Sequence, residues 1–291
     1  MTATAERVSF YFSAHQDDWQ LFMNPPAFLD VLDDKCRCIF VHMTAGDAGL
    51  GLGKGGRKQP LYLARENGAE VAIRFMADAN ERPPAEATVA MAAFNGHPIR
   101  CLRYRNTAAY FLRLPDGSPA GTGYAATGFQ SLTRLANGDI ATLTAVDDTA
   151  VYRGWDDLTA TLRAIIALER GPNATLQLHV PELDPALNLN DHADHYMTAK
   201  AALDAAAGMP AQITQEVTHH VGYASGGLPD NLGAAERDMK CAVYAVTLAG
   251  VLALDHQVSW QHYDQMFVGR NYYRVEDRPR STADRGTPIA N

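Results

Sequence analysis

Residues 8–18 read VSFYFSAHQDD, and this stretch decides the fold. Its first seven residues form a short run with β-branched and aromatic side chains, as expected of a strand in the core of a sheet. The run leads into His15, Asp17 and Asp18. In open parallel sheets, ligands bind beyond the carboxyl ends of the strands, so these side chains lie where chemistry takes place. His15 and Asp18 can close on one metal ion and leave Asp17 to act on a water molecule, which predicts metal-assisted hydrolysis.

Outward from this stretch, strand-like and helix-like segments alternate along the chain. Such alternation is typical of an α/β protein with a mainly parallel sheet that is covered by helices on both faces. We expect strands at residues 8–14, 38–43, 99–104 and 176–180, and helices at residues 25–32, 61–76, 155–169, 196–207 and 234–252.

One segment, residues 106–152, breaks this alternation. It is dense in Gly, Thr and Asp, and it carries turn signals at 115–117 and 137–139. We therefore expect an insertion of loops and short hairpins outside the core, which forms a lid or rim over the substrate. Residues 276–291 are rich in Arg, Pro, Ser and Thr and predict a flexible tail. No repeat or linker divides residues 1–275, so we expect a single domain.

The composition excludes several classes of protein. With 47% hydrophobic and 20% charged residues, the 291-residue chain resembles an ordinary soluble globular protein. Its formal net charge of −8 argues against a nucleic-acid partner, because phosphate binding needs a positive field. Apolar stretches are too short for a membrane span. The first residues show no basic region followed by an apolar core, so we expect a cytoplasmic protein.

A second cluster of polar residues reads Asp-His-Ala-Asp-His at residues 191–195, where a helix should begin after the 176–180 strand. Histidines three apart in a helix share one face. Because both clusters follow predicted parallel strands, His15, Asp18 and His195 can converge into a site with two histidines and one carboxylate. This ligand set suits Zn²⁺ and several other divalent metals.

A glycine-rich stretch, GLGKGG at residues 51–56, suggests an alternative function. It matches the Gly-x-Gly-x-x-Gly fingerprint of dinucleotide-binding proteins, which would make the chain a nucleotide-dependent dehydrogenase. That fingerprint turns directly from strand into helix, whereas residues 44–49 precede the glycines here and Pro60 separates them from the next helix. The dehydrogenase is therefore the least favoured alternative.

Three motifs together resemble the LmbE/PIG-L zinc deacetylases: AHQDD at residues 14–18, TAGDAG at 44–49, and His192-x-Asp194-His195. The resemblance covers residues 8 to about 206. It implies a Rossmann-like three-layer fold. It also implies removal of the acetyl group from an N-acetylglucosamine-type sugar on a larger glycoconjugate.

The resemblance also implies roles for individual residues. The zinc ligands would be His15, Asp18 and His195, the general base Asp17, and the general acid or oxyanion partner His192. Arg65 and Asp47 would contact the substrate, although a surface ion pair of Arg65 with Glu66 or Glu70 is an equal alternative. Asp194 would orient an imidazole or cap the helix.

The chain departs from the family pattern at two positions. Gln16 replaces the usual proline, which should alter the rigidity of the loop more than its chemistry. Trp19 replaces the usual glutamate, so the support that this glutamate gives the site must come from elsewhere. The segment 106–152 is similar to that of members that act on glycopeptide antibiotic intermediates of the teicoplanin type. A non-catalytic sugar-binding module on the same fold remains the alternative to an enzyme.

Overall fold

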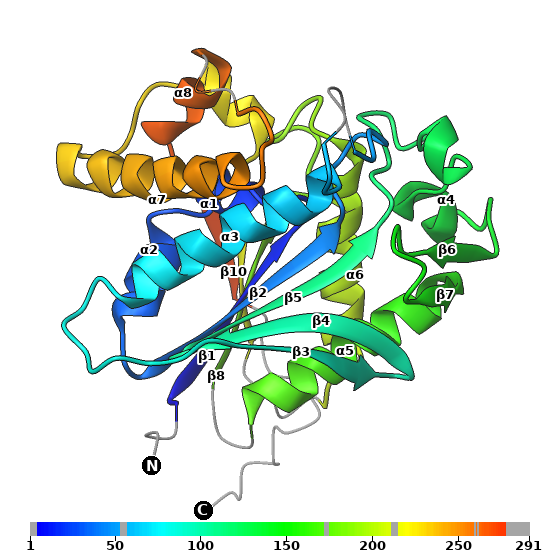
Figure 1. Ribbon diagram of the computed structural model, residues 1–291, viewed down its shortest axis with the longest axis horizontal. Coiled ribbons are helices and arrows are strands. Elements are labelled where there is room, and N and C mark those ends of the chain that lie inside the picture. The colour runs from blue at the N-terminus through cyan, green and yellow to red at the C-terminus, as the bar shows by residue number, and fades with distance from the viewer. Residues whose placement is uncertain are drawn as a thin grey trace, which may run out of the picture.

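The computed structural model describes residues 5–52, 57–171, 175–210, 215–258, 260 and 262–277. It is an α/β fold built on an eight-stranded mixed sheet of order β10-β9-β8-β1-β2-β5-β4-β3 (Figure 1). The five strands from β9 to β5 run parallel, and β10, β4 and β3 are antiparallel to their neighbours. The sheet strands are β1 (Arg7–Ser13), β2 (Cys36–Thr44), β3 (Thr88–Phe94), β4 (His97–Tyr104), β5 (Thr107–Leu114), β8 (Thr175–Pro181), β9 (Gln215–His220) and β10 (Tyr273–Asp277). These results confirm the predicted fold class.

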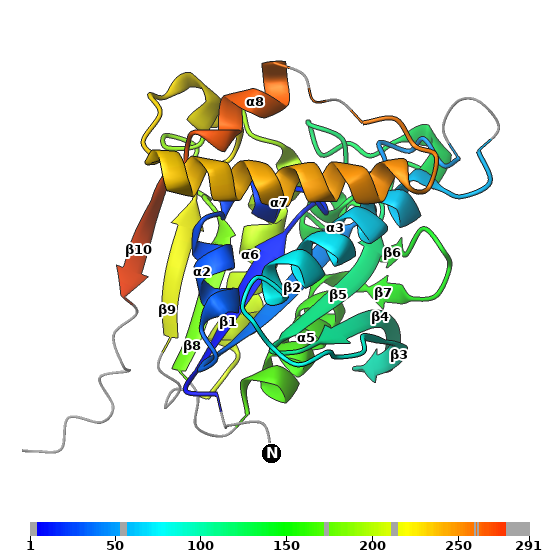
Figure 2. The ribbon, with the colours of Figure 1, turned by 60° about the vertical axis from the view of Figure 1, so that its left-hand side comes forward.

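Helices cover both faces of the sheet, as the alternation predicts (Figure 2). Successive residues of β1 point to opposite faces, so Phe10 and Phe12 pack into one apolar cluster and Tyr11 into another. The first cluster includes residues of α5 and α6, and the second includes residues of α2, α3 and α7. The helices are α1 (Asp18–Phe22), α2 (Pro26–Leu32), α3 (Leu61–Ala77), α4 (Leu132–Ala136), α5 (Gly154–Arg170), α6 (Ala193–Ala207), α7 (Ala234–Leu252) and α8 (His262–Val268).

Helices α3 and α7 lie side by side in unusually close contact (Figure 2). A Cβ atom at Gly250 would lie 2.7 Å from the Cα atom of Gly68, and one at Gly68 would lie 2.7 Å from the carbonyl oxygen of Thr247. The two glycines therefore allow the helix backbones to approach each other. This contact holds α7 beside the carboxyl ends of the parallel strands.

The prediction for residues 106–152 is wrong in its first part. Thr107–Leu114 forms β5, an inner strand that pairs with β2 and β4, so this portion belongs to the sheet. The rest contains the predicted loops and a separate hairpin of β6 (Thr142–Thr144) and β7 (Val151–Arg153). Even here, Leu132, Leu135 and Leu143 are buried in the core cluster. Much of the segment therefore belongs to the sheet and the hydrophobic core, not to an insertion outside the core.

Other differences concern elements at the sheet edges and the chain end. The sequence did not predict β3, β9 or β10. Glu276 and Asp277, expected in a flexible tail, end strand β10, and residues 278–291 lie outside the described part of the chain. The same holds for residues 53–56 of the glycine-rich stretch. Among the described helices, none combines the length and apolar character that crossing a membrane requires.

Candidate metal centre and active site

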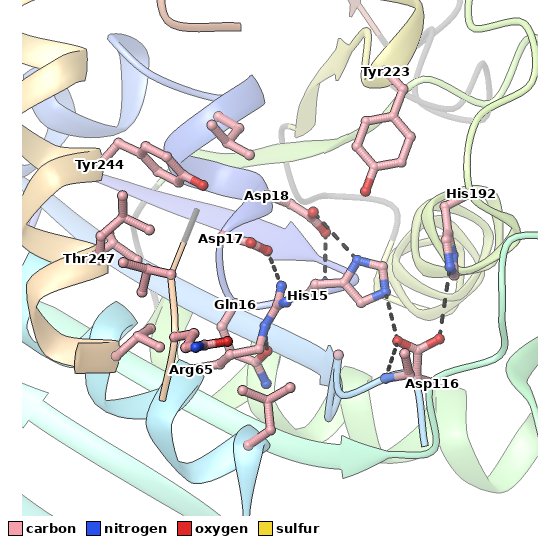
Figure 3. Close-up of a pocket in the computed structure, with 18 of the residues that line it drawn as sticks. His15, Gln16, Asp17, Asp18, Arg65, Asp116, His192, Tyr223, Tyr244 and Thr247 are labelled. Carbon is pink, nitrogen blue, oxygen red and sulfur yellow. Dashed lines mark hydrogen bonds and ion pairs between the residues drawn. The ribbon is translucent and has the colours of Figure 1, made fainter. Parts of the chain in front are cut away.

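A cavity of about 420 Å³ lies beyond the carboxyl ends of the parallel strands. His15, Gln16, Asp17 and Asp18 come from the turn between β1 and α1 and line its floor (Figure 3). Other parts of the wall come from α3, α7, the loop after β5 and the beginning of α6. The topology therefore delivers the residues of both sequence clusters to one edge of the sheet, as predicted.

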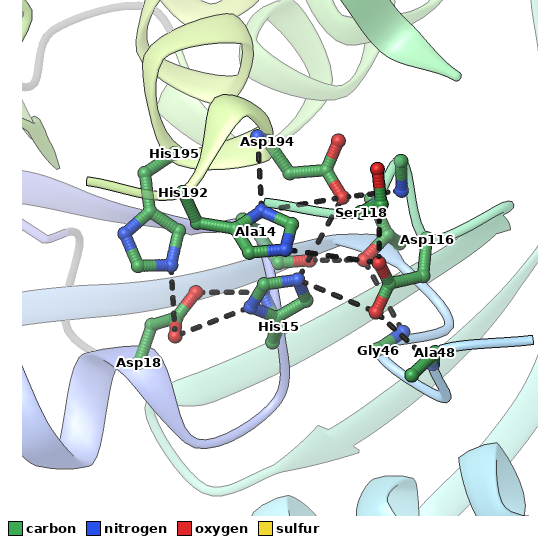
Figure 4. Close-up of polar contacts among 12 residues, drawn as sticks. Ala14, His15, Asp18, Gly46, Ala48, Asp116, Ser118, His192, Asp194 and His195 are labelled. Atoms are coloured by element: carbon green, nitrogen blue, oxygen red, sulfur yellow. Dashed lines mark hydrogen bonds and ion pairs between the residues drawn. The ribbon is translucent and has the colours of Figure 1, made fainter. Parts of the chain in front are cut away.

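His15, Asp18 and His195 converge beside this cavity (Figure 4): His15 and Asp18 line it, and His195 is buried behind them. The Asp18 Oδ1 atom lies 3.3 Å from His195 Nε2 and 3.6 Å from His15 Nδ1. The other carboxylate oxygen of Asp18 accepts a hydrogen bond of 2.7 Å from the backbone N–H of His15. One oxygen of Asp18 is thus fixed by the turn, and the other faces both imidazoles.

The Asp191 carboxylate fixes the orientation of His195. It lies 2.9 Å from His195 Nδ1 and also accepts a hydrogen bond from the backbone N–H of His192. With Nδ1 donating to Asp191, His195 presents Nε2 toward Asp18. A carboxylate behind a histidine ligand is a common arrangement in metal sites, where it sets the ring orientation and raises ligand basicity.

The charges of these residues fit a divalent cation. Burial disfavours the charged forms, but the Asp18 carboxylate outweighs this effect and raises the pKa of His15 to about 10. Asp18 and Asp191 likewise raise the pKa of His195, despite its burial. The carboxylates around the two imidazoles therefore favour positive charge at this place, as a site for a divalent cation requires. Among the described residues, His15 Nε2 and His195 Nε2 are also buried without a hydrogen-bond partner. The donor set thus fits the implied metal.

Asp116 joins the site, and the sequence analysis missed it. It follows β5, accepts hydrogen bonds from the backbone N–H groups of Ser118 and Ala48, and lies 3.8 Å from both His15 Nε2 and His192 Nε2. A second group, His15, Asp116, His192 and Asp194, is also close enough to hold a cation. The sequence showed only a turn signal at this position, because its place in the site depends on β5 being a sheet strand.

His192 caps the N-terminus of α6. Its Nδ1 atom accepts a hydrogen bond of 3.2 Å from the backbone N–H of Asp194, so the neutral ring carries its proton on Nε2. Burial and the positive charge of His15 lower the pKa of His192 to about 4, although Asp194 and Asp116 oppose this shift. The side chain is therefore a neutral hydrogen-bond donor at pH 7, with its donor nitrogen toward Asp116.

Asp194 does not cap the helix, contrary to one of its two predicted roles. Its Oδ2 atom accepts a hydrogen bond of 2.8 Å from the backbone N–H of Gly117 and lies 3.7 Å from His15 Nε2. It also lies 3.8 Å from His192 Nδ1. The position is compatible with the other predicted role, orientation of an imidazole.

Asp17 lies on the cavity wall and forms an ion pair with Arg65 (Figure 3). Arg65 Nε also donates a hydrogen bond of 3.2 Å to Gln16 Oε1, and Gln16 Nε2 donates one of 2.9 Å to the carbonyl oxygen of Thr44. Gln16 thus connects the end of β2 to the guanidinium group that touches Asp17.

The alternative partners of Arg65 are occupied elsewhere. Glu66 binds Arg113 through both of its carboxylate oxygens, and Glu70 pairs with Arg100. The predicted surface ion pair of Arg65 with either glutamate is therefore wrong. Its placement in the cavity wall agrees with the predicted contact to substrate.

Asp47 is placed differently from the prediction. It is buried, does not line the cavity, and accepts hydrogen bonds from the backbone N–H groups of Gly49 and Gly51. Its carboxylate shapes its own loop and does not face the cavity, contrary to the predicted contact with substrate. Trp19, where a glutamate is usual, is fully buried and packs against Phe40.

Comparison with known proteins gives limited information. No protein-family model and no curated protein matches the chain. Among solved structures, it is similar to the N,N'-diacetylchitobiose deacetylase from Pyrococcus horikoshii, with a TM-score of 0.49 and 15% sequence identity over 94% of this chain and 84% of that chain. At this distance, the similarity says nothing about what the present chain acts on.

Proposed function

We propose that the protein is a metal-dependent hydrolase that removes the N-acetyl group from an N-acetylglucosamine-type sugar on a larger conjugate. The observation that carries this proposal is the buried convergence of His15, Asp18 and His195, with Asp17 and His192 on the walls of the same cavity. The resemblance of three sequence motifs to the LmbE/PIG-L deacetylases supports the same reaction. The products would be acetate and a free amine.

The metal, Zn²⁺ in this proposal, would be held by His15, Asp18 and His195. Bound there, a divalent cation would polarise the amide carbonyl and make water acidic enough to react near neutral pH. Asp17 neighbours a ligand residue but is turned toward Arg65, which leaves its carboxylate available as a base. It accepts the proton of the attacking water. Arg65, which pairs with that carboxylate, lines the same cavity and lies where it can contact substrate oxygens.

His192 acts on the carbonyl oxygen and on the departing amine. Its Nε2–H group can donate a hydrogen bond to the oxygen that becomes negative when water adds to the carbonyl carbon. It can also deliver a proton to the departing amine nitrogen, provided that the ring regains one from Asp17 during the reaction. Asp116, 3.8 Å from Nε2, would stabilise the ring while it carries a positive charge.

The proposal is tested by measuring acetate release from N-acetylglucosaminides together with the metal content of the protein. Wild-type protein with Zn²⁺ should release acetate, and His195→Ala should lose both metal and activity. Asp17→Asn should retain metal while turnover falls by roughly 10²–10⁴-fold. Asp34→Asn is the matched control, because Asp34 is exposed and precedes β2 at the opposite end of the sheet.

Two outcomes would contradict this assignment. Loss of metal from Asp17→Asn would mean that the two aspartates have been assigned the wrong way round. Binding of the sugar without any acetate release would favour the non-catalytic sugar-binding module. A panel that includes a glycopeptide pseudoaglycone of the teicoplanin type would test the proposed conjugate.

A further inference from the structure

The cavity has a polar end and an apolar end. His15, Asp18, Asp116 and His192 form the polar end, whereas the opposite wall comes from α7 and the start of α3. Figure 3 shows Tyr244 and Thr247 on one side of Asp17 and Arg65, with His192 and Asp116 on the other. The aliphatic side chains of α3, α7 and the segment after α7 that line the cavity are Leu61, Leu248, Val251 and Val258, and the ring of Tyr244 lies on the same wall.

The one hydroxyl-bearing aliphatic side chain on this part of α7 has its hydrogen bonds within the protein. Thr247 Oγ1 donates to the carbonyl oxygen of Val243 at 3.0 Å and accepts from Gln20 Nε2 at 3.3 Å. The other polar groups on this wall are the phenolic hydroxyl of Tyr244 and the side chain of Gln257, which is exposed at the rim. The remaining side chains of this end are aliphatic and suit a hydrocarbon group, whose burial is favourable.

The roles in the proposed reaction decide which part of the substrate faces this end. His192 serves the amide nitrogen, so the sugar that bears the nitrogen lies on the His192 side, near Pro119 and Tyr124. At the planar carbonyl carbon of the amide, the alkyl part of the acyl group extends away from the nitrogen. It therefore points past Asp17 toward α7.

On this basis we infer that the apolar end binds the acyl group of the amide substrate and extends the range of acyl groups that the enzyme removes from acetyl to longer chains. The inference rests on the proposed function and deepens it: the substrate class is an N-acylated amino sugar with a linear alkyl acyl chain.

The reaction balances with water as the only co-reactant. A C–O bond forms between water and the carbonyl carbon, and the C–N bond of the amide breaks. One proton of water passes to Asp17 and from there to His192, which delivers a proton to the amine nitrogen, so both side chains return to their starting protonation states. The products are a fatty carboxylic acid and the free amino sugar.

The test measures kcat/KM for N-acetyl-, N-butyryl-, N-hexanoyl- and N-octanoylglucosamine. Each methylene buried in the apolar end should raise kcat/KM by about threefold to fourfold until the chain fills the space. Leu248→Asp places a charge on this wall and should lower the ratio of octanoyl to acetyl activity by at least about tenfold. Leu61→Ser, on the facing helix, should lower the same ratio and serves if Leu248→Asp fails to fold.

Leu252→Asp is the matched control. Leu252 lies on the same helix and is 53% exposed, outside the cavity. This variant should leave the ratio unchanged. A flat dependence of wild-type kcat/KM on acyl length would overturn the inference, and so would an equal effect of Leu248→Asp and Leu252→Asp.

A binding measurement separates this inference from the proposed function. Calorimetry with Asp17→Asn should show tighter binding of N-octanoylglucosamine than of N-acetylglucosamine. If octyl glycosides of N-acetylglucosamine gain affinity instead, the apolar end binds the aglycone and the assignment to the acyl chain is overturned. Tighter binding of the octanoyl amide without fatty acid release by wild-type protein would keep the apolar subsite and refute the hydrolysis.

Discussion

Gln16 links two parts of the site through a single buried side chain. Its amide donates to the Thr44 carbonyl and accepts from Arg65, which in turn pairs with Asp17. A proline at this position, usual in the resembling family, cannot make either bond. The expectation that Gln16 alters loop rigidity more than chemistry therefore needs an addition: in this chain the residue positions the guanidinium group beside the candidate base.

A substitution of Gln16 tests this positioning role. Gln16→Leu keeps the side-chain size but removes the hydrogen bonds to the Thr44 carbonyl and to Arg65, so that Arg65 keeps only its ion pair with Asp17. The loss of a buried hydrogen bond costs about 1–3 kcal/mol, so we expect KM for the sugar to rise by roughly tenfold or more. Metal content should remain at the wild-type level, because none of the three candidate ligands changes. Gln16→Glu should restore the contact to Arg65, and an unchanged KM in Gln16→Leu would refute the role.

At the residue scale, the sequence predicted the convergence of His15, Asp18 and His195 because strand ends constrain where such residues lie. It could not predict Asp116, because that position requires β5 to be recognised as an inner strand. The sequence could not predict the ion pair of Asp17 with Arg65 either. This ion pair joins the β1–α1 turn to α3, and no periodicity in the sequence relates these two positions.

At the scale of elements, the close contact of α3 and α7 depends on Gly250. In Gly250→Ala, the added Cβ atom would lie 2.6 Å from Val71 Cγ2 and 2.7 Å from the Cα atom of Gly68, so the helices must move apart. This strain typically costs 1–3 kcal/mol or more, whereas alanine gains only about 1 kcal/mol in helix propensity. We expect a net loss of about 1–2 kcal/mol in the free energy of unfolding, measured by urea denaturation.

The exposed Leu252 on the same helix provides the comparison. Leu252→Ala should change the free energy of unfolding by less than about 0.5 kcal/mol. Since α7 also forms the apolar wall of the cavity, Gly250→Ala should weaken binding of long-chain substrates as well. A Gly250→Ala protein as stable as wild type would show that the helices tolerate a wider separation.

Glu169, near the end of α5, ties this helix to three strands. It pairs with Arg37 of β2 and Arg103 of β4 and accepts a hydrogen bond from Tyr110 of β5. Burial raises the pKa of Glu169, but Arg37, Tyr110 and Arg103 outweigh it and hold the pKa below its ordinary value. A carboxyl group with a lowered pKa stabilises the fold above its unfolded-state pKa, about 4.3, and this contribution disappears as the pH falls through the folded-state pKa.

Glu169→Gln should therefore lose stability in a pH-dependent manner. At pH 7 the variant leaves two arginines without their counter-charge, and we expect it to be less stable by about 1–3 kcal/mol. The difference from wild type should shrink as the pH falls below about 4. Urea denaturation at several pH values measures it. A difference that stays constant down to pH 3 would assign the loss to packing and not to charge.

The sequence predicted the strands with compact apolar runs and missed those without them. β1 and β2 are buried along almost their whole length, so their composition identifies them. β3 is exposed over most of its residues and begins an edge hairpin, which leaves no apolar alternation to detect. The first residues of β5, Thr107 to Ala109, have small side chains and follow a turn. For this reason the sequence predicted an insertion where the structure has an inner strand.

For the whole molecule, the candidate metal centre joins segments from the two ends of the core. His15 and Asp18 follow β1, and His195 lies in α6 after β8. An unfolded chain does not hold these three side chains together, so a bound metal should stabilise the folded state. The stabilisation is about 2.7 kcal/mol when free metal exceeds its dissociation constant by 100-fold.

Removal of metal should accordingly lower the thermal midpoint. Adding Zn²⁺ to chelator-treated protein should raise Tm by several degrees, since 1 kcal/mol corresponds to about 2–4 °C in a protein of 150–250 residues. Asp191→Asn, which weakens the support of His195, should require roughly 10–100 times more Zn²⁺ for the same rise. The control Asp184→Asn changes an exposed carboxylate in the same loop and should respond like wild type. If Zn²⁺ leaves Tm unchanged in wild type, or raises it equally in His195→Ala, the three residues do not form the metal site.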